Sequence, residues 1–314
     1  MKTHRILHLI GWLVSGILLF LWQENYLPFH YEYIEQFRLF HSSAESFIEH
    51  ASYPSGLVEY IASYLIQFFS QPYWGAGIVT LLFLIIGIGM QLIFKRICTR
   101  VDMPLAYLLP VLLLLFAGMD LNYHLEGTLA FALTVWLLNL QIRITRPLYR
   151  IISGGLLSWI IFYLAGPAFV VFALCSVIYE WHKRELPIVY SALLLPVAVL
   201  PACYAYFIAH SEPFRILFLP DAYTNHKVEG QPILYYAWMA LPLLFALACL
   251  LGRWKKTVSS IVKGASVSIQ LLVLVIILFQ GNEKYNSPSL AQVKALDYYS
   301  RNKQWDHILG LQVS

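Results

Sequence analysis

Two acidic side chains, Glu32 and Glu35, lie three positions apart in the segment 31–40 and could do chemistry together. Positions three and four apart share one face of a helix, so Gln36 would lie beside them. The opposite face would carry the apolar side chains Tyr33, Ile34, Phe37 and Phe40. Two neighbouring carboxylates can raise one another's pKa and act as a general base, or they can bind a divalent cation. We predict Glu32 and Glu35 as catalytic residues and Gln36 as a substrate contact; a solvated amphipathic face is the alternative.

Further substrate contacts are predicted from residues that follow in the chain. Glu59 begins a polar stripe on the otherwise apolar segment 56–70, and we predict that it contacts substrate. The long loop 210–231 carries two cations, Arg215 and Lys227, which suit the phosphate of a lipid headgroup. The alternative is that these cations form ion pairs with nearby acids. Those acids are Glu212, Asp221 and Glu229.

No metal site is predicted. Asp120, Asn122, His124 and Glu126 alternate along one short segment and are of types that bind metals. However, they match no established ligand spacing, and the four cysteines of the chain show no C-x-x-C pattern, which disfavours a zinc site or a disulfide framework.

The composition predicts a helical membrane protein. Apolar residues make up 59% of the 314 positions and charged residues only 12%, whereas soluble domains carry about 25% charged residues. Apolar stretches of spanning length alternate with charged loops and predict about nine transmembrane helices. The stretches are 6–22, 74–94, 103–118, 127–142, 151–165, 168–181, 187–209, 233–251 and 261–280.

The basic residues give the orientation. Of the 21 Lys and Arg residues, 14 fall in alternate loops, and only Arg38, Arg215 and Lys227 fall in the opposite ones before the tail. The positive-inside rule then places the N-terminus in the cytoplasm and the tail outside, in the cytoplasmic membrane of a bacterium. Because these charges are spread over short loops between helices, they do not indicate nucleic-acid binding. The acidic residues and histidines that collect in the outer loops indicate either solvation of those loops or a site at the outer surface.

Three segments allow two interpretations. Stretch 6–22 could be a signal peptide, but no small-x-small cleavage pattern follows it, so we predict an uncleaved anchor. Residues 151–181 could form one helix kinked at Pro167, but we predict two shorter helices, because the run is too long for one span. Residues 56–70 would cover only about 22 Å as a helix. They are therefore predicted to lie at the interface or to re-enter, and not to span.

The architecture resembles the membrane half of lipid-linked-sugar glycosyltransferases of the multi-span C-type fold. A cytoplasmic start, a large acidic first outer loop (23–73) with amphipathic helices, and many spans carry this resemblance. It implies sugar transfer from a polyprenyl-phosphate carrier at the outer face, with a first-loop carboxylate, Glu32 or Glu35, as the base or metal-linked group. The adjacent acidic pair typical of that group is absent, because two residues separate these glutamates.

A second resemblance is to a family of bacterial polytopic membrane proteins with a domain of unknown function. It is carried by the stretches 35–40 and 53–60 and by Gln67-Phe68-Phe69. It implies no activity, but its members continue into a soluble region of helical repeats. The tail, 282–314, contains an amphipathic stretch, 289–300, that is similar to the start of a tetratricopeptide-type pair. Because about three repeats are needed for stability, we expect a longer protein or a truncated gene.

Together these features predict an all-α polytopic bundle over 1–281, with an interfacial helix, and a short extracytoplasmic helical tail over 282–314. The first functional hypothesis is a glycosyltransferase-like protein acting at the outer leaflet. The second is a non-catalytic scaffold or anchor that binds protein partners through its tail. A transporter is third, because the spans contain few ionisable residues.

Overall fold

The computed structural model places most of the chain in helices. The residues that it describes are 2–36, 40–71, 73–98, 106–185, 187–210, 212–224, 232–253, 288–301 and 303–304, with isolated positions between 265 and 279. Within these ranges all the secondary-structure elements are helices, apart from an isolated antiparallel β-bridge between Tyr123 and Thr224. The predicted all-α class is confirmed for this part of the chain.

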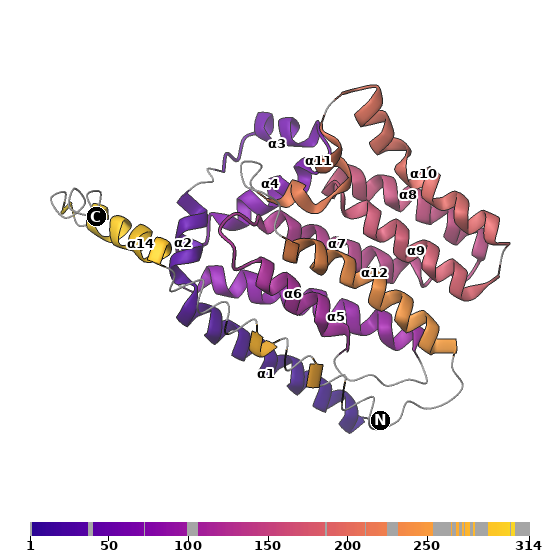
Figure 1. The fold of residues 1–314 in the computed structure, drawn as a ribbon, viewed down its shortest axis with the longest axis horizontal. Coiled ribbons are helices and arrows are strands. Elements are labelled where there is room, and N and C mark those ends of the chain that lie inside the picture. The colour runs from indigo at the N-terminus through magenta and orange to yellow at the C-terminus, as the bar shows by residue number, and fades with distance from the viewer. Residues whose placement is uncertain are drawn as a thin grey trace.

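Eight helices of the described chain form an up-and-down bundle in which successive helices of this set run antiparallel (Figure 1). They overlie the first eight predicted stretches; the ninth, 261–280, is described only at isolated positions. These helices are α1 (Lys2–Tyr26), α5 (Trp74–Ile97), α6 (Leu109–Ala117) with the 3₁₀ turn η1 (Ala106–Leu108) before it, α7 (Leu125–Gln141), α8 (Pro147–Ala165), α9 (Ala168–Lys183), α10 (Ile188–Phe207) and α12 (Pro232–Arg253).

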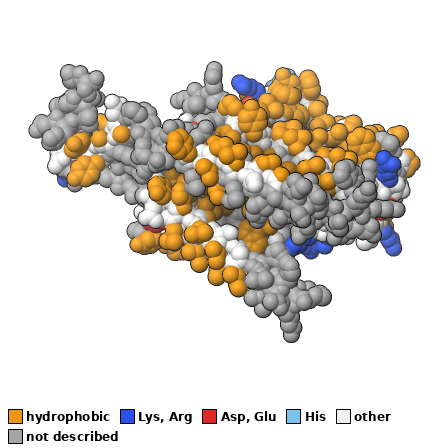
Figure 2. All heavy atoms as spheres, turned by 60° about the horizontal axis from the view of Figure 1, so that its bottom comes forward, with side chains coloured by type: hydrophobic (Ala, Val, Ile, Leu, Met, Phe, Trp, Pro, Cys, Tyr) orange, Lys and Arg blue, Asp and Glu red, His pale blue; other side chains and the backbone are white. Residues whose placement is uncertain are grey.

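Four of these helices, α5, α8, α10 and α12, are long and apolar enough to cross a membrane. Their outward faces carry exposed aliphatic side chains, such as Leu156 on α8, Leu193 on α10 and Leu243 on α12. Apolar side chains cover much of the described surface in Figure 2. Because monomeric soluble proteins rarely expose large contiguous apolar patches, these helices fit a protein that lies in a lipid bilayer.

The division between α8 and α9 follows the prediction of two helices. Gly166 ends α8 with a φ of 62°, a conformation that residues with a Cβ rarely adopt, and its N–H donates to Phe162 O. Pro167 then precedes the first turn of α9. The rings of Phe162 and Phe169 meet edge to face at 5.4 Å across this corner, which fixes α8 against α9.

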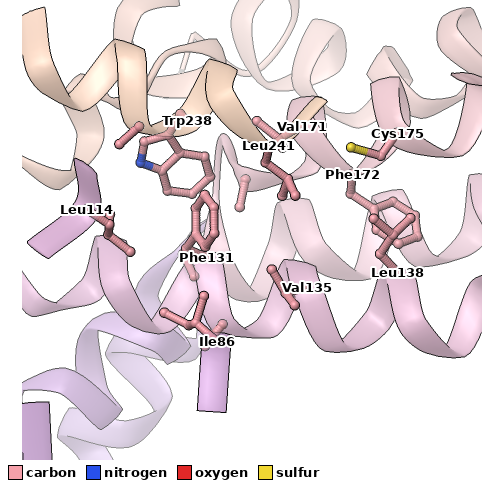
Figure 3. Close-up of a cluster of buried hydrophobic side chains, with 14 of the residues drawn as sticks. Ile86, Leu114, Phe131, Val135, Leu138, Val171, Phe172, Cys175, Trp238 and Leu241 are labelled. Carbon is pink, nitrogen blue, oxygen red and sulfur yellow. The ribbon is translucent and has the colours of Figure 1, made fainter. Parts of the chain in front are cut away.

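The centre of the bundle is built on α7 and α9. Phe131 on α7 packs edge to face against Trp238 on α12, with ring centroids 5.3 Å apart (Figure 3). One turn further along α7, a Cβ at Gly89 of α5 would lie 2.6 Å from Val135 Cγ1, so only glycine lets the two helices approach this closely. The buried amide of Asn139 donates to Gly89 O at 2.9 Å, which satisfies a polar group inside the apolar core.

Three short helices, α2 (Pro28–Gln36), α3 (Ala44–Ala51) and α4 (Gly56–Ile66), lie between α1 and α5 in the chain. With 11 residues, α4 is about 16 Å long, well short of a hydrocarbon core of about 30 Å. It packs against α7 and α8 and is tied to them where Ser55 N donates to Tyr163 O at 3.0 Å. Two further short elements, α11 (Phe214–Phe218) and the 3₁₀ turn η2 (Pro220–Tyr223), precede α12, and α14 (Pro288–Arg301) lies in the tail.

Candidate functional site at the acidic end of the bundle

The antiparallel course of the helices separates charge between the two ends of the bundle. We call the end that holds the α7–α8 and α9–α10 connections the basic end; its described cations include Lys95, Arg146 and Lys183. The other end, which holds α4 and the α6–α7 and α10–α12 connections, is the acidic end. Its described carboxylates include Glu59, Asp120, Glu126, Glu212 and Asp221.

The predicted catalytic pair lies on α2 at the acidic end. The side chain of Glu35 is half-buried, whereas the side chains of Glu32 and Gln36 lie outside the described part of the structure. The inward face of α2 differs from the expected one: His30 and Tyr31 are buried, and Tyr33 is only partly covered. The reason is that the helix begins at Pro28 and packs on α5 from its first turn.

A small cavity of about 40 Å³ lies under α2, lined by side chains of α1, α2, α5 and the α6–α7 connection. Tyr31 forms its polar wall: its hydroxyl donates to Gln23 Oε1, and Gln23 Nε2 in turn donates to Thr80 Oγ1 at 3.1 Å. Burial, and then the nearby carboxylate of Glu24, raise the pKa of Tyr31 above its usual value. Tyr31 therefore stays protonated and anchors α2 on the bundle.

Glu59, predicted as a substrate contact, accepts a hydrogen bond that the sequence did not reveal. Tyr53 Oη donates to Glu59 Oε2 at 2.9 Å. Burial raises the pKa of Tyr53, and the charges of Glu59, Glu126 and Glu49 raise it further. Glu126 is only 6% exposed and sits in the first turn of α7, where the helix dipole favours an anion.

His124 and the α6–α7 connection lie beside Glu126. His124 Nδ1 lies 3.4 Å from Glu126 Oε2. The connection is fixed by its own contacts, since Asp120 Oδ1 accepts from Asn122 N at 2.8 Å and His124 N donates to Tyr223 O at 2.9 Å. Glu126 and His124 thus form a carboxylate–imidazole pair on a rigid frame, and such a pair can accept or donate a proton.

Arg215, predicted as a phosphate contact, lies on α11 with its side chain 72% exposed. Its Nε lies 3.3 Å from Asp221 Oδ2, so the alternative expectation of an ion pair with a neighbouring acid is confirmed. The hydroxyl of Tyr235 donates to the same oxygen at 2.6 Å. Lys227, the second predicted cation, lies outside the described residues.

The predicted site residues do not form a single cluster within the described part of the chain. Glu35 is on α2, Glu59 is on α4 beside α7, and Arg215 is on α11 beside η2. Among the described residues, no group of three or more His, Cys, Asp or Glu side chains could hold a metal ion.

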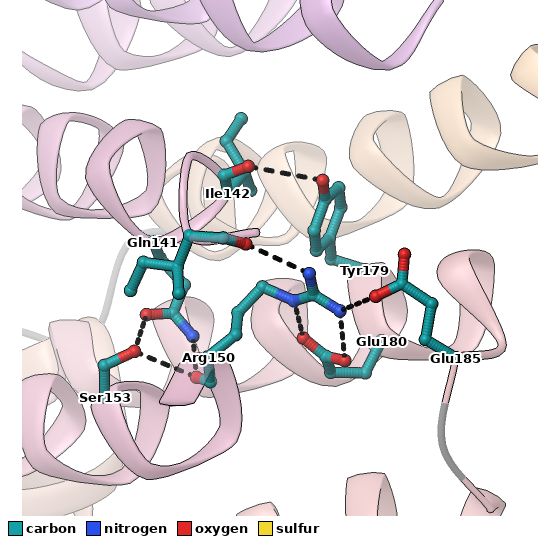
Figure 4. Close-up of polar contacts among 8 residues, drawn as sticks. Gln141, Ile142, Arg150, Ser153, Tyr179, Glu180 and Glu185 are labelled. Atoms are coloured by element: carbon teal, nitrogen blue, oxygen red, sulfur yellow. Dashed lines mark hydrogen bonds and ion pairs between the residues drawn. The ribbon is translucent and has the colours of Figure 1, made fainter. Parts of the chain in front are cut away.

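A buried ion pair at the basic end was missed by the sequence reasoning, which placed Arg150 in a loop. Arg150 lies in the first turn of α8, is 1% exposed, and donates through Nη2 to Glu180 Oε2 at 2.9 Å (Figure 4). Its Nε donates to the other oxygen of Glu180, and Nη2 also reaches Glu185 Oε2 at 3.0 Å. The available signal was Glu180 itself, an acid near the end of the predicted apolar stretch 168–181.

Comparison with curated proteins and with solved structures finds no match. The family model of DUF6057, a family of unknown function, matches residues 3–313. This match spans the helical bundle, the acidic-end residues and the tail helix α14 alike. The chain therefore belongs to this family of unknown function.

Proposed function

We propose that this chain is a glycosyltransferase-like protein of about nine spans that acts at the outer leaflet of a bacterial cytoplasmic membrane on a polyprenyl-phosphate-linked substrate. The basic end faces the cytoplasm in this proposal, with the N-terminus, and the tail lies outside. The acidic end then faces the compartment in which lipid-linked sugars are used.

The observation that carries the proposal is the carboxylate of Glu59, a predicted substrate contact at the acidic end. A transferase must hold the acceptor beside the base that removes the proton of the acceptor hydroxyl as it attacks the sugar. Glu59 accepts a hydrogen bond from Tyr53 at 2.9 Å and remains half-exposed, so an acceptor can reach it. The charge of Glu126, which is 6% exposed, acts on the same tyrosine.

In this proposal Glu32 or Glu35 on α2 is the base or the ligand of a divalent cation, Gln36 and Glu59 contact the substrate, and Arg215 and Lys227 contact its phosphate. Two positions, Glu35 and Glu59, have described surroundings and are the ones to test first. Both lie on short helices at the acidic end, where α2 and α4 pack against the spanning helices α5 and α8 respectively.

The test is a transfer assay in membrane vesicles that contain the full chain, with a radiolabelled hexose on polyprenyl phosphate as donor. We expect wild-type vesicles to release label from the organic-soluble fraction. Glu35→Gln should lower that rate by about 100-fold or more, within the range for loss of a general base. Glu59→Gln removes a charged substrate contact and should lower it by about tenfold or more.

The matched control is Glu45→Gln, because Glu45 is a fully exposed acid of the same loop region on α3. It should leave the rate unchanged. If wild-type vesicles release no label, or if Glu59→Gln and Glu35→Gln both keep the wild-type rate at equal protein levels, the proposal is wrong.

A non-catalytic anchor is the second candidate, and α14 is the observation that favours it. This tail helix presents Tyr298 to solvent, with its ring in contact with that of Tyr299. An exposed aromatic on a terminal helix suits a protein partner. Under this proposal, Tyr298→Ala lowers recovery of a cross-linked partner, whereas Glu59→Gln has no effect on it.

A further inference from the structure

Two arginines of this chain form ion pairs with carboxylates, and they differ in how far the arginine is exposed. Arg150 is buried, and its guanidinium donates to Glu180, to Glu185 and to Ile144 O. Arg215 approaches Asp221 no closer than 3.3 Å, and 72% of its side chain is exposed. A guanidinium has five N–H donors in a planar fork. Those of Arg150 are used inside the protein, while most of those of Arg215 remain open to solvent.

Asp221, behind Arg215, is held firmly by the protein. It is 9% exposed, and its Oδ2 accepts from Tyr235 Oη at 2.6 Å. Its backbone oxygen accepts from both the N–H and the hydroxyl of Thr224, at 3.1 and 2.9 Å. Its Oδ1 is buried and, among the residues that the structure describes, has no hydrogen-bond partner. Because the side chain of Arg215 is 72% exposed, its ion pair with Asp221 contributes little to stability. The carboxylate therefore orients Arg215 more than it stabilises the fold.

The surroundings of Arg215 suit a lipid. Its neighbour Phe214 is exposed and stacks on Phe218, with centroids 4.7 Å apart, and it also contacts the ring of Tyr206 at the end of α10. Because α10 is long and apolar enough to cross a membrane, this corner lies where a span leaves the bilayer. Aromatic side chains gather at that depth, beside the headgroups.

An open hollow adjoins the same corner. It has a volume of about 490 Å³ and is lined by Tyr206, Phe207, His210, Glu212 and Pro213, and this volume lies in the range of about 300–1,000 Å³ that ligand sites occupy. Pro213 is the N-cap of α11, so the hollow adjoins the start of the helix that carries Arg215. An apolar chain and a phosphate on one molecule would match both features.

We propose that Arg215, oriented by Asp221 and Tyr235, binds the phosphate group of a membrane lipid, and that Asp221 is the positioning residue of this site. The inference deepens the proposed function, on which it rests for the assignment of phosphate to Arg215 and for the identity of the natural lipid. The oriented guanidinium can form two parallel hydrogen bonds with phosphate oxygens, which a lysine cannot do.

The test titrates the purified full chain with phosphatidic acid, phosphatidylcholine or inorganic phosphate, and measures bound lipid or phosphate by native mass spectrometry. We expect phosphatidic acid to bind in preference to the other two. Arg215→Gln should lower its affinity about tenfold or more, the size of one lost charge-assisted hydrogen bond. Arg215→Lys, which keeps the charge and loses the fork, should lower it less.

Asp221→Asn and Glu212→Gln separate orientation from simple charge, since each removes one negative charge near Arg215. If Asp221 orients the guanidinium, Asp221→Asn weakens binding of phosphatidic acid severalfold, whereas Glu212→Gln, which removes a carboxylate of the hollow that repels phosphate, strengthens it. Tyr235→Phe, which removes one donor to Asp221, gives a second variant should Asp221→Asn fold poorly, and it should weaken binding less.

The proposed site is wrong if Arg215→Gln binds phosphatidic acid with the affinity of the wild type, or if Asp221→Asn and Glu212→Gln strengthen binding equally. Equal binding of inorganic phosphate would refute the lipid assignment. Because this readout needs no sugar transfer, it can succeed when the transfer assay fails. If Arg215→Gln leaves both sugar transfer and lipid binding unchanged, that result refutes the Arg215 site alone and not the proposed transferase function.

Discussion

Arg150 Nη2 lies 2.9 Å from Glu180 Oε2, and both side chains are buried where α8 and α9 meet at the basic end. The guanidinium also lies 5.3 Å from the centre of the Tyr179 ring. Two opposite charges with several hydrogen bonds can remain inside a bundle, whereas one alone cannot. This pair therefore ties the first turn of α8 to the last turn of α9 at the basic end.

Glu180→Gln is expected to lower the free energy of unfolding by about 3–5 kcal/mol, because it leaves the charge of Arg150 buried with weaker compensation. The double variant Arg150→Met with Glu180→Leu should recover part of this loss. Thermal unfolding in detergent measures both. Arg146→Gln is the control, since Arg146 is exposed and only lies over the ring of Tyr149, and it should cost less than about 1 kcal/mol.

Gly166→Ala is expected to destabilise the α8–α9 corner by about 1–3 kcal/mol. The φ of 62° disfavours any side chain, and a Cβ would lie 3.0 Å from Ser55 Cβ. The midpoint of thermal unfolding should fall. Gly11→Ala in α1 is the matched control, because a Cβ there meets nothing within 4 Å. An equal midpoint for the two variants would show that the corner tolerates a side chain.

Cysteine labelling tests the orientation. In a cysteine-free background, Glu212→Cys at the acidic end should react with a membrane-impermeant maleimide in intact cells. Arg146→Cys at the basic end should react only after the cells are opened. The physical reason is that Lys and Arg residues favour the cytoplasmic side. The reverse labelling pattern would show that the bundle has the opposite orientation, and that the proposed site does not lie at the outer leaflet.

The buried tyrosines of the acidic end predict a loss of stability in alkali. Burial raises the pKa values of Tyr53, Tyr123 and Tyr223 in the folded state. Above the ordinary tyrosine pKa of about 10, the unfolded chain releases these protons while the folded chain keeps them, so stability falls as the pH rises. The absorbance of tyrosinate should therefore grow together with unfolding above about pH 10. Early, independent ionisation of these tyrosines would contradict this prediction.

The fold was predictable where a local rule decides the outcome. The separation of α8 from α9 follows from Gly166-Pro167, because both residues end helices, and α4 is as short as its apolar run suggested. The buried face of α2 was harder to predict from the sequence. Tyr31 and Tyr33 are residues of the same type, and only the packing of α2 on α5 determines that Tyr31 is the buried one.

The candidate site was only partly predictable. Glu59 and Glu126 were each noticed, but they come from separate elements, and only the packing of α4 on α7 brings them to the same tyrosine hydroxyl. Arg150 was misplaced for a related reason. A cation after a proline resembles a loop residue until its partner Glu180 on the next helix is known.

The two central helices, α7 and α9, have 17 and 16 residues. They are therefore about 24–26 Å long, a few ångströms shorter than a hydrocarbon core of about 30 Å. Longer neighbours on several sides, α5, α8, α10 and α12, shield them from lipid. Irregular backbone can lie at membrane depth only behind such a protein wall. The loop from Gly118 to His124 that starts α7 can therefore sit in a recess below the level of the headgroups. A molecule reaching Glu126 would have to leave bulk water and sink below the surface of the leaflet.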